Sequence, residues 1–322
     1  MNDFYAYYVH RMDPVVVHLG GSIALRWYGL AYMAGFLAGY ALLVHWARKG
    51  IGELKSERVG DFLTGAALFG VILGGRLGYM LLYPSGREDL AANPLNFFKL
   101  WNGGMASHGG IMGLFFFTLY WSWKHKVSWT GLGDNLVVAA PVGLFCGRMA
   151  NFINGELYGR STDVAWAMQF PNEIETWRAD GDFEKYTAVQ NWLLENTPGD
   201  RMDFAALARE NSAFAEFLGT VLTPRHPSQL YAAAVEGLLL FLILLFVRTK
   251  RPNAPHGLLT GLFFVLYAVF RIIDENYRQP DAYIMGLTEG QFYSVFLILI
   301  GVGFLLYSSR QKQPTVHAAA GV

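Results

Sequence analysis

The chain has 322 residues, of which 53% are hydrophobic and only 16% are charged, and its formal net charge at pH 7 is zero. This leaves too little polar surface to cover a soluble domain of this size, so the composition indicates a polytopic membrane protein. The balanced charge argues against a nucleic-acid partner, because counterion release needs clustered Lys and Arg. The single cysteine, Cys146, excludes an intrachain disulfide and a cysteine-based metal site.

Seven blocks of mostly apolar residues follow one another along the chain. Each is close to the length of roughly 20 residues that a helix needs to cross a bilayer. Strand-like alternation is absent, and only helices satisfy their own backbone in lipid, so we expect an all-α fold with seven transmembrane helices. In chain order the expected spans are Ser22–Trp46, Gly60–Leu82, Gly109–Trp123, Leu132–Ala150, Gln229–Val247, Leu258–Ile273 and Leu287–Tyr307.

Lys and Arg in the short loops predict the orientation of these helices. They are concentrated after the first, third, fifth and seventh spans, so the positive-inside rule puts the N-terminus outside and the C-terminus in the cytoplasm. The N-terminus lacks the basic flank of a cleavable signal peptide, and the first block is expected to be retained as a span. The expected cytoplasmic residues are Arg48, Lys49, Lys55, Arg58, Lys124, Lys126, Arg248, Lys250, Arg251, Arg310 and Lys312.

One connection, residues 152–225, is much longer than the others. It carries twelve Asp and Glu against six Lys and Arg, and we expect it to form a small extracytoplasmic head domain between the fourth and fifth helices. The other expected divisions are residues 1–151 for the first four helices, with a re-entrant or arm segment near 84–108, residues 226–309 for the last three helices, and residues 310–322 for a cytoplasmic tail.

The stretch Gly147–Arg160 contains two Arg, two Asn and one Glu directly after the apolar run Leu136–Cys146. An Arg within a membrane span is costly unless it faces a polar cavity or a partner. Its three glycines allow a close backbone approach or a positive φ. We therefore expect this stretch to form one wall of a site for an anionic ligand.

Three arginines are predicted at a similar depth in the membrane. Counted along their helices, Arg76, Arg148 and Arg271 each fall in the outer third of a hydrocarbon layer about 30 Å thick. Arg271 also has Glu275 four residues later, the spacing of a structural ion pair. Guanidinium groups match phosphate oxygens bidentately, so the headgroup of a phospholipid is the expected ligand. Tyr28, His108, His226, Ser228 and Gln229 open other spans at the same level.

His108 lies between two glycine pairs, Gly103-Gly104 and Gly109-Gly110, where the expected re-entrant segment meets the third span. A histidine has a reference pKa near neutrality and can take a proton from an incoming nucleophile, although a structural role is an equal alternative. Neither Ser107 nor Ser228 lies in a nucleophile motif, so we expect the attacking group to belong to a substrate.

Six ordered blocks of sequence closely resemble the prolipoprotein diacylglyceryl transferases of bacteria, and only the head and the two tails are uninformative. The blocks are Trp27-Tyr28-Gly29-Leu30, Gly74-Gly75-Arg76-Leu77-Gly78-Tyr79, Gly103-Gly104-Met105 with His108-Gly109-Gly110, the stretch Gly147–Arg160, Arg225-His226-Pro227-Ser228-Gln229-Leu230-Tyr231, and Phe270-Arg271-Ile272-Ile273 with Glu275 and Arg278-Gln279-Pro280-Asp281.

The resemblance implies an enzyme of the bacterial plasma membrane with its active site toward the periplasm. Such an enzyme moves the diacylglyceryl group of phosphatidylglycerol onto the lipobox cysteine in the signal peptide of a preprolipoprotein. It forms a thioether, releases glycerol phosphate and needs no metal or organic cofactor. Its partners are therefore membrane lipid and a signal peptide.

Residue roles follow from the resemblance together with the chemistry of the side chains. The catalytic candidates are Arg148 and Arg271, which would hold the phosphate, His108, which would deprotonate the substrate thiol, and Tyr267, which would orient Arg271. A tyrosine remains the alternative base. The substrate-binding candidates are Tyr28, Arg76, Asn151, Asn154, Glu156, Gly159, Arg160, His226 and Glu275. Two departures from the family pattern are Ala106-Ser107 before the histidine and Ala232 where a Glu often stands.

Two other functions are compatible with parts of the sequence. A phospholipid or anion transporter could use the arginine layer as a binding site, but no internal repeat is found. A membrane aspartyl protease would match Gly131-Leu132-Gly133-Asp134, with Asp61 as the second carboxylate. Because both aspartates precede apolar runs, we expect them to be helix N-caps instead.

Overall fold

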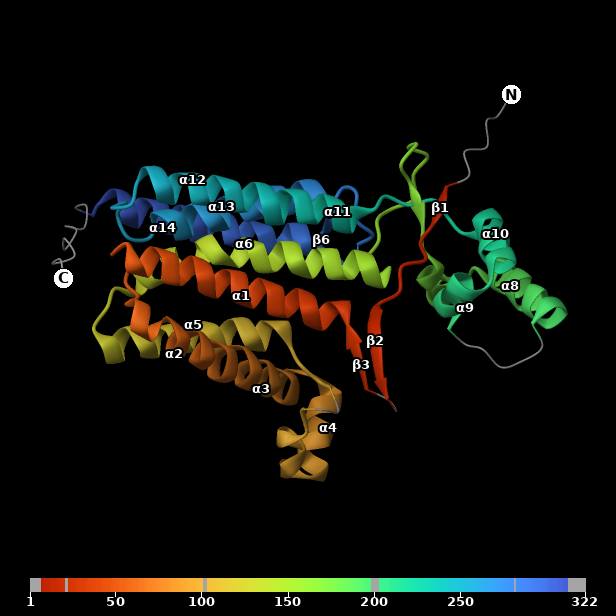
Figure 1. Ribbon diagram of the computed structural model, residues 1–322, viewed down its shortest axis with the longest axis horizontal. Helices are drawn as coiled ribbons and strands as arrows, with labels where there is room; N and C mark the ends of the chain where they lie inside the picture. The colour runs from red at the N-terminus through yellow and green to blue at the C-terminus, as the bar shows by residue number, and fades with distance from the viewer. Residues whose placement is uncertain (1–6, 21–22, 101–102, 198–202, 281, 312–322) are drawn as a thin grey trace. The chain divides into compact units, whose positions relative to one another are not determined.

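Helices account for most of the chain (Figure 1). The computed structural model describes residues 7–20, 23–100, 103–197, 203–280 and 282–311, and 72% of these residues are helical. The chain forms two compact units that are interleaved in sequence, and each is described by itself. Unit 1 consists of Met1–Phe36, Pro141–Leu242 and Phe264–Ile300, and unit 2 consists of Leu37–Ala140, Ile243–Phe263 and Gly301–Val322.

Five helices among the described residues are long and apolar enough to cross a membrane. They are α1 (Trp27–Arg48), the helix Ser56–Leu82, α6 (Trp129–Asn154), the helix Ser228–Lys250 and α14 (Glu289–Ser309). Two further apolar helices, α5 (Ser107–His125) and α13 (Leu258–Asp274), coincide with the expected third and sixth spans. Every expected span therefore contains a helix, and five of these helices have the length and composition of a membrane crossing.

Two of the long helices contain a π-helical segment. The helix Ser56–Leu82 consists of a 3₁₀ turn, α2 (Val59–Gly65), the π-helical segment Ala66–Ile72 and α3 (Leu73–Leu82). The helix Ser228–Lys250 consists of α11 (Ser228–Ala232), the π-helical segment Ala233–Leu239 and α12 (Leu240–Lys250). Such segments are frequent at functional sites.

Short strands occur in unit 1, where the sequence suggested none. β2 (Val15–Gly20) pairs with β3 (Ile23–Arg26), β5 (Tyr283–Ile284) pairs with β6 (Leu287–Thr288), and β1 (Tyr8–Val9) runs parallel to β4 (Met168–Gln169). The expected starts of the first and last spans were wrong for this reason. The β-branched run Val15–Val17 favours extended chain, and the helices begin only after β3 and β6.

In unit 2, glycines allow α3 and α5 to approach closely. A Cβ on Gly78 would lie 2.6 Å from the Cα atom of Gly109, and a Cβ on Gly74 would lie 2.8 Å from the Cα atom of Gly113. These distances are too short for any other residue type. Gly74 and Gly78 on α3, with Gly109 and Gly113 on α5, therefore serve helix packing of the kind common in membranes.

Asp134 fastens two segments of unit 2 together. Its Oδ2 atom accepts a hydrogen bond from Gly257 N at 2.8 Å, and its Oδ1 atom accepts two from Thr260, from N and Oγ1, both at 2.7 Å. The expectation that Asp134 caps its own helix was wrong, because it lies inside α6 and caps the first turn of α13 instead. Asp61 lies in the first turn of α2 and is not its N-cap.

The expected head region contains four helices with a hydrophobic core. These are α7 (Ile174–Asp180), α8 (Phe183–Asn196), α9 (Phe204–Glu210) and α10 (Ser212–Val221). Trp177, Val189, Phe214 and Leu218 are buried together. Beside this core, the fully buried Glu173 forms an ion pair with Arg225 and accepts a hydrogen bond from Trp177 Nε1 at 3.1 Å.

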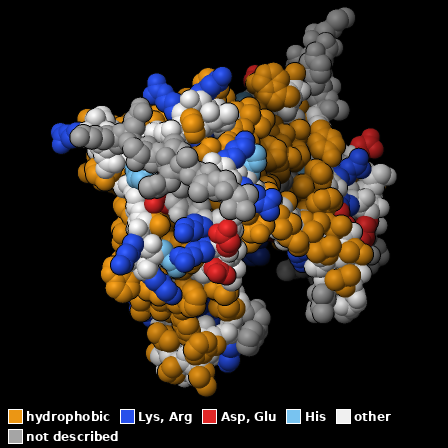
Figure 2. Space-filling model, turned by 60° about the vertical axis from the view of Figure 1, so that its left-hand side comes forward, with side chains coloured by type: hydrophobic (Ala, Val, Ile, Leu, Met, Phe, Trp, Pro, Cys, Tyr) orange, Lys and Arg blue, Asp and Glu red, His pale blue; other side chains and the backbone are white. Residues whose placement is uncertain are grey.

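Lys and Arg side chains gather on the face that Figure 2 brings forward, and hydrophobic side chains cover much of the rest of this view. Several helices end in basic residues within unit 2, including Arg48 on α1, Lys124 on α5, and Arg248 and Lys250 on α12. A cation in the last turn of a helix interacts favourably with the helix dipole, and basic helix ends mark one side of a membrane protein. Lys312 and the tail beyond it lie outside the described residues.

Candidate functional site

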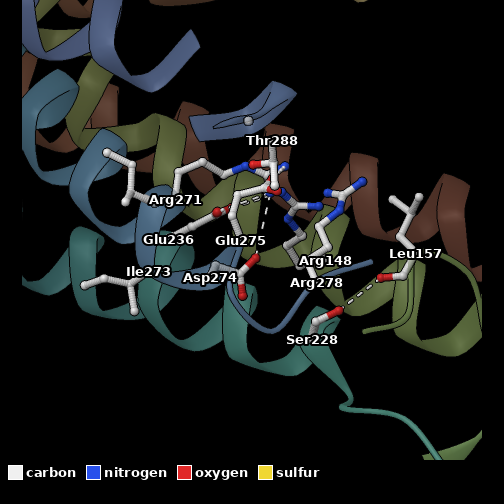
Figure 3. Close-up of polar contacts among 12 residues, drawn as sticks. Arg148, Leu157, Ser228, Glu236, Arg271, Ile273, Asp274, Glu275, Arg278 and Thr288 are labelled. Atoms are coloured by element: carbon white, nitrogen blue, oxygen red, sulfur yellow. Dashed lines mark hydrogen bonds and ion pairs between the residues drawn. The ribbon is translucent and has the colours of Figure 1, made fainter. Parts of the chain in front are cut away.

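Two arginines from different helices of unit 1 meet at one buried carboxylate (Figure 3). Arg148 lies on α6, Arg271 lies on α13, and Glu236 lies in the π-helical segment Ala233–Leu239. Arg148 Nη2 donates a hydrogen bond to Glu236 Oε2 at 2.9 Å, and Arg271 Nη1 lies 3.5 Å from Glu236 Oε1. The Glu236 side chain is fully buried. A carboxylate there would be costly alone, and the two cations compensate its charge.

Two more carboxylates follow Arg271 along the chain. Glu275 forms an ion pair with Arg271 Nη2, so the i, i+4 pair expected from the sequence is confirmed. Asp274 Oδ2 lies 3.8 Å from Arg271 Nη1, and both carboxylate side chains are buried. We call Arg148, Arg271, Glu236, Asp274 and Glu275 the arginine–carboxylate cluster. Within the described parts of the chain, no three His, Cys, Asp or Glu side chains are arranged to hold a metal ion.

Neighbouring residues on α13 and α14 shape the surroundings of Arg271. Tyr267 lies four residues before Arg271 and therefore on the same side of α13. A Cβ on Gly290 would lie 2.6 Å from Glu275 Cδ and 2.9 Å from Arg271 Nε. Glycine at this position lets the first turn of α14 pack directly against the ion pair.

A second polar network joins α1 to the end of α6. The buried Asn151 donates two hydrogen bonds from Nδ2, to the Tyr28 hydroxyl at 2.6 Å and to Glu156 Oε1 at 2.7 Å. The backbone fixes this arrangement, because Glu156 N donates to Asn151 O at 3.1 Å and Gln229 Nε2 donates to Glu156 O at 2.7 Å. A phenol, an amide and a carboxylate are thus held in one network that can both donate and accept hydrogen bonds.

The chain turns sharply after α6 to carry Glu156. Gly155 has φ +67° and Leu157 has φ +55°, and a positive φ is uncommon for a residue other than glycine. Ser228 Oγ donates to Leu157 O at 3.2 Å, which holds the turn in place (Figure 3). Backbone strain of this kind persists where the surroundings over-determine it, and it is often found at functional sites.

Gly159 and Arg160 are held by two other segments of unit 1. Gly159 N donates to His226 O at 2.9 Å, Arg160 N donates to Tyr277 O at 2.8 Å, and Arg160 Nε donates to Arg278 O at 3.0 Å. A Cβ on Gly159 would lie 2.5 Å from Tyr277 O, so the crossing point requires glycine. Burial lowers the pKa of the His226 imidazole.

Asn154 lines a polar cavity of about 240 Å³ within unit 1. Its Oδ1 atom is buried and has no hydrogen-bond partner among the described residues, whereas its backbone oxygen accepts a hydrogen bond from Asn172 Nδ2 at 2.9 Å. Other residues that line this cavity are His10, Arg26, Glu156 and Arg209. The cavity therefore reaches the Glu156 carboxylate of the second network.

His108 belongs to unit 2 and is the second residue of α5, where its side chain is exposed. The glycines before it turn the chain into the helix, because Gly103 has φ +77° and Gly104 has φ +79°. Only glycine adopts such angles without strain. The local sequence thus presents His108 at a helix start, and its relation to the substrate is taken up below as a proposal.

Arg76 also belongs to unit 2 and is only 2% exposed. A guanidinium has five N–H donors, and here all five are directed at backbone carbonyl oxygens. The acceptors are Asn96, Phe97, Lys99, Gly103 and Gly104, in the segment between α4 (Pro84–Ala92) and α5. Arg76 therefore holds this segment in place, and no donor in this arrangement is left over for a phosphate.

Two members of the arginine–carboxylate cluster, Glu236 and Asp274, were not among the expected site residues, although Glu236 lies one turn after Ala232, where the family often has a Glu. Glu236 had a signal, since an acidic residue within an apolar span indicates a function or an ion pair by default. The sequence gives little signal for Asp274, because this residue directly precedes Glu275 and resembles part of an exposed helix end. Its burial depends on Arg271 and on contacts that no local pattern encodes.

Comparison with known proteins agrees with the sequence blocks. The family model for prolipoprotein diacylglyceryl transferase matches residues 14–307. The chain is 37% identical to a phosphatidylglycerol–prolipoprotein diacylglyceryl transferase of Bdellovibrio bacteriovorus, with 94% of each chain covered. It is 39% identical to the protein of the same name from Neisseria gonorrhoeae, covering 94% of this chain and 98% of the relative. It is also 39% identical to that of Rhodospirillum centenum, with 96% of each chain covered.

Proposed function

The chain belongs to the prolipoprotein diacylglyceryl transferase family, and we propose that the arginine–carboxylate cluster is where it binds the lipid phosphate. It is a transferase that moves the diacylglyceryl group of phosphatidylglycerol to a prolipoprotein. The acceptor is the thiol of the lipobox cysteine. A carbon–sulfur bond forms, the bond between the diacylglyceryl carbon and the phosphate oxygen breaks, and glycerol phosphate leaves with the electron pair.

One observation carries this proposal: Arg148 and Arg271 converge on one buried carboxylate, Glu236. A guanidinium group is always charged, and its planar donors match the oxygens of a phosphate. As the carbon–oxygen bond breaks, the phosphate gains negative charge. Donors already in position stabilise that charge without reorganising.

The network of Tyr28, Asn151 and Glu156 positions the head group of the lipid. Its donors and acceptors are oriented by backbone hydrogen bonds before the substrate arrives. Pre-organisation of this kind lowers the entropy that binding must overcome. Gly159, Asn154, Arg160 and His226 complete the wall that carries Glu156.

The thiol must lose a proton before it attacks, since the thiolate is the nucleophile. His108 or a tyrosine, Tyr28 or Tyr267, takes this proton. Arg76 contributes to this step as a positioning residue, because its guanidinium holds the segment that leads into the helix of His108. His108→Gln and Tyr267→Phe separate the candidates, since only loss of the base shifts the pH at which the transfer rate is half-maximal.

We also propose that the chain crosses the bacterial inner membrane seven times, with α5 and α13 in addition to the five long helices. The N-terminus and residues 152–225 then lie in the periplasm and the C-terminus in the cytoplasm, and residues 84–108 form an arm at the periplasmic surface. Support comes from the basic ends of α1, α5 and α12. In a Cys146→Ser background, an impermeant thiol reagent applied to intact spheroplasts should label Glu184→Cys but not Lys126→Cys.

The function is tested with purified protein, labelled phosphatidylglycerol and a lipobox peptide. We expect the peptide mass to increase by one diacylglyceryl group, and a matched peptide with Ser in place of the lipobox Cys should remain unmodified. An unmodified Cys peptide at saturating lipid would reject the transferase reading.

The two other functions considered from the sequence gain no support. The Asp134 carboxylate accepts three hydrogen bonds from Gly257 and Thr260. Both of its oxygens therefore hold the start of α13, which suits a structural role better than protease catalysis. A transporter would carry lipid across the bilayer without altering the peptide. The assay above therefore separates it from a transferase.

A further inference from the structure

Four polar atoms in the arginine–carboxylate cluster are buried and have no hydrogen-bond partner among the described residues. They are Arg271 Nη1, Glu236 Oε1, Asp274 Oδ1 and Asp274 Oδ2. Arg271 Nη1 is 3.5 Å from Glu236 Oε1 and 3.8 Å from Asp274 Oδ2, which is ion-pair range but too far for a good hydrogen bond. Buried polar groups are normally paired, so such a concentration calls for an explanation.

Other atoms of the cluster do have partners, and the comparison shows where partners are missing. Glu236 Oε2 is bonded to Arg148 Nη2, and Glu275 is bonded to Arg271 Nη2. Asp274 differs from its two fellow carboxylates, because neither of its oxygens accepts a hydrogen bond from the described residues, although its side chain is 1% exposed. Figure 3 shows Asp274 and Glu236 both directed at the Arg271 guanidinium, each joined to it by a dashed line.

The unused atoms define what would complete the cluster. One donor, on Arg271, lies beside three acceptors, on Glu236 and Asp274. The donor suits an oxygen of an anion, and the acceptors suit hydroxyl groups carried next to that anion. A phosphate diester of glycerol has this combination, because its phosphate oxygens accept and its two hydroxyl groups donate.

We propose that Asp274 is a specificity-determining residue that accepts hydrogen bonds from the hydroxyl groups of the glycerol head group, while Arg271 binds the neighbouring phosphate. This inference rests on the proposed function and extends it to a residue that the sequence blocks do not contain. Asp274 does not touch the reacting carbon. Its contribution is therefore made equally in the ground state and in the transition state, and it should appear in KM more than in kcat.

The test compares two lipids with the same acyl chains. Phosphatidylglycerol carries both hydroxyl groups, whereas phosphatidylpropanol keeps the phosphate diester and has no hydroxyl in its head group. Two hydrogen bonds to a carboxylate should give the wild-type protein a preference for phosphatidylglycerol of about 100-fold in kcat/KM. In Asp274→Asn, which removes the charge at nearly constant shape, the preference should fall to about tenfold or less, because hydrogen bonds to neutral acceptors are weaker.

The Asp274→Asn substitution should lower kcat/KM for phosphatidylglycerol only. Transfer from phosphatidylpropanol should change less than about threefold, since that lipid never used Asp274. Glu184→Gln is the matched control, because this exposed carboxylate on α8 lies outside the cluster and its substitution should leave both lipids unaffected. Asp274→Leu, which removes both acceptor oxygens, should lower the preference at least as far as Asp274→Asn.

Several outcomes would overturn the proposal. One is a wild-type protein that uses both lipids equally, a result that does not depend on whether any variant folds. Others are an undiminished preference in Asp274→Asn, and an equal loss with both lipids, which would assign Asp274 to holding Arg271 only. A wild-type protein that modifies the peptide with neither lipid would instead reject the proposed function itself.

Discussion

Arg76 is buried and Arg271 is half-buried, and both lie on apolar helices, yet their guanidinium groups have different surroundings. In unit 2, every N–H of Arg76 is directed at a backbone carbonyl oxygen. In unit 1, Arg271 faces three carboxylates, and its Nη1 atom makes no hydrogen bond to a described residue. The carbonyl oxygens use every donor of Arg76, whereas the carboxylates leave Arg271 Nη1 without a hydrogen bond to a described residue.

The difference shows that burial alone does not identify a binding arginine. What separates the two cases is the kind of acceptor and whether any donor is left unused. A fully bonded guanidinium can bind a ligand only by giving up bonds that hold the fold together. Arg271 can bind one by turning a donor that is already free.

The substitution Arg271→Lys is the strongest test of this comparison. The charge remains but the planar fork is lost, so we expect kcat/KM for transfer to fall about 1,000-fold while the melting temperature in detergent changes little. Arg251→Lys, an exposed change in unit 2, is the matched control and should keep full activity. Comparable activity in Arg271→Lys would remove the reason for treating this arginine as the phosphate ligand.

Arg76→Lys should give the opposite result. One ammonium cannot reach acceptors spread from Asn96 to Gly104, so we expect the free energy of unfolding to fall by about 3 kcal/mol. Residual activity, measured well below the lowered melting temperature, should show a KM for phosphatidylglycerol close to that of the wild type. Arg87→Lys on α4 is exposed and controls for the substitution. A raised KM at unchanged stability would make Arg76 a lipid ligand after all.

Sequence alone predicted the arginines and one of their partners, Glu275, but not the others. Each apolar block contains a helix whose ends lie within a few residues of most expected ends, and the i, i+4 spacing predicted the pair Arg271–Glu275. Glu236, 88 positions from Arg148, and the carbonyl cage of Arg76 depend on contacts between distant segments, which no local period encodes. Three arginines that appeared equivalent by depth therefore have at least two different roles.

The buried aspartates Asp134 and Asp274 also differ in how many hydrogen bonds they accept, and Asp134→Asn tests this difference. Asp134 accepts three hydrogen bonds, whereas Asp274 accepts none from the described residues. An amide in place of Asp134 turns one acceptor into a donor that faces Gly257 or Thr260, so we expect a loss of about 2 kcal/mol in stability. The KM for phosphatidylglycerol should not change. The measurement is thermal unfolding of Asp134→Asn and Asp274→Asn in parallel. Asp274→Asn should lose lipid preference with little loss of stability.

His10 is a further buried titratable group, and aromatic rings pack against it. Its ring packs edge-on against Phe152 at 5.3 Å and stacks on Phe170 at 5.4 Å, and burial lowers its pKa to about 4. In the unfolded chain its pKa is near 6.5. The unfolded state therefore binds the proton first, so the stability that His10 contributes is full above pH 6.5 and is lost as the pH falls toward 4.

We expect this loss to be about 1–2 kcal/mol between pH 7 and pH 4.5, the smallest of these effects, because water near the ring offsets part of the burial. It is measured as the fall in melting temperature with pH. His10→Phe, which cannot take up a proton, should flatten that fall, whereas His18→Gln on the exposed face of β2 should leave it as steep as in the wild type. An equally steep fall in His10→Phe would mean that other groups set the acid sensitivity and that this ring is not kept neutral by its surroundings.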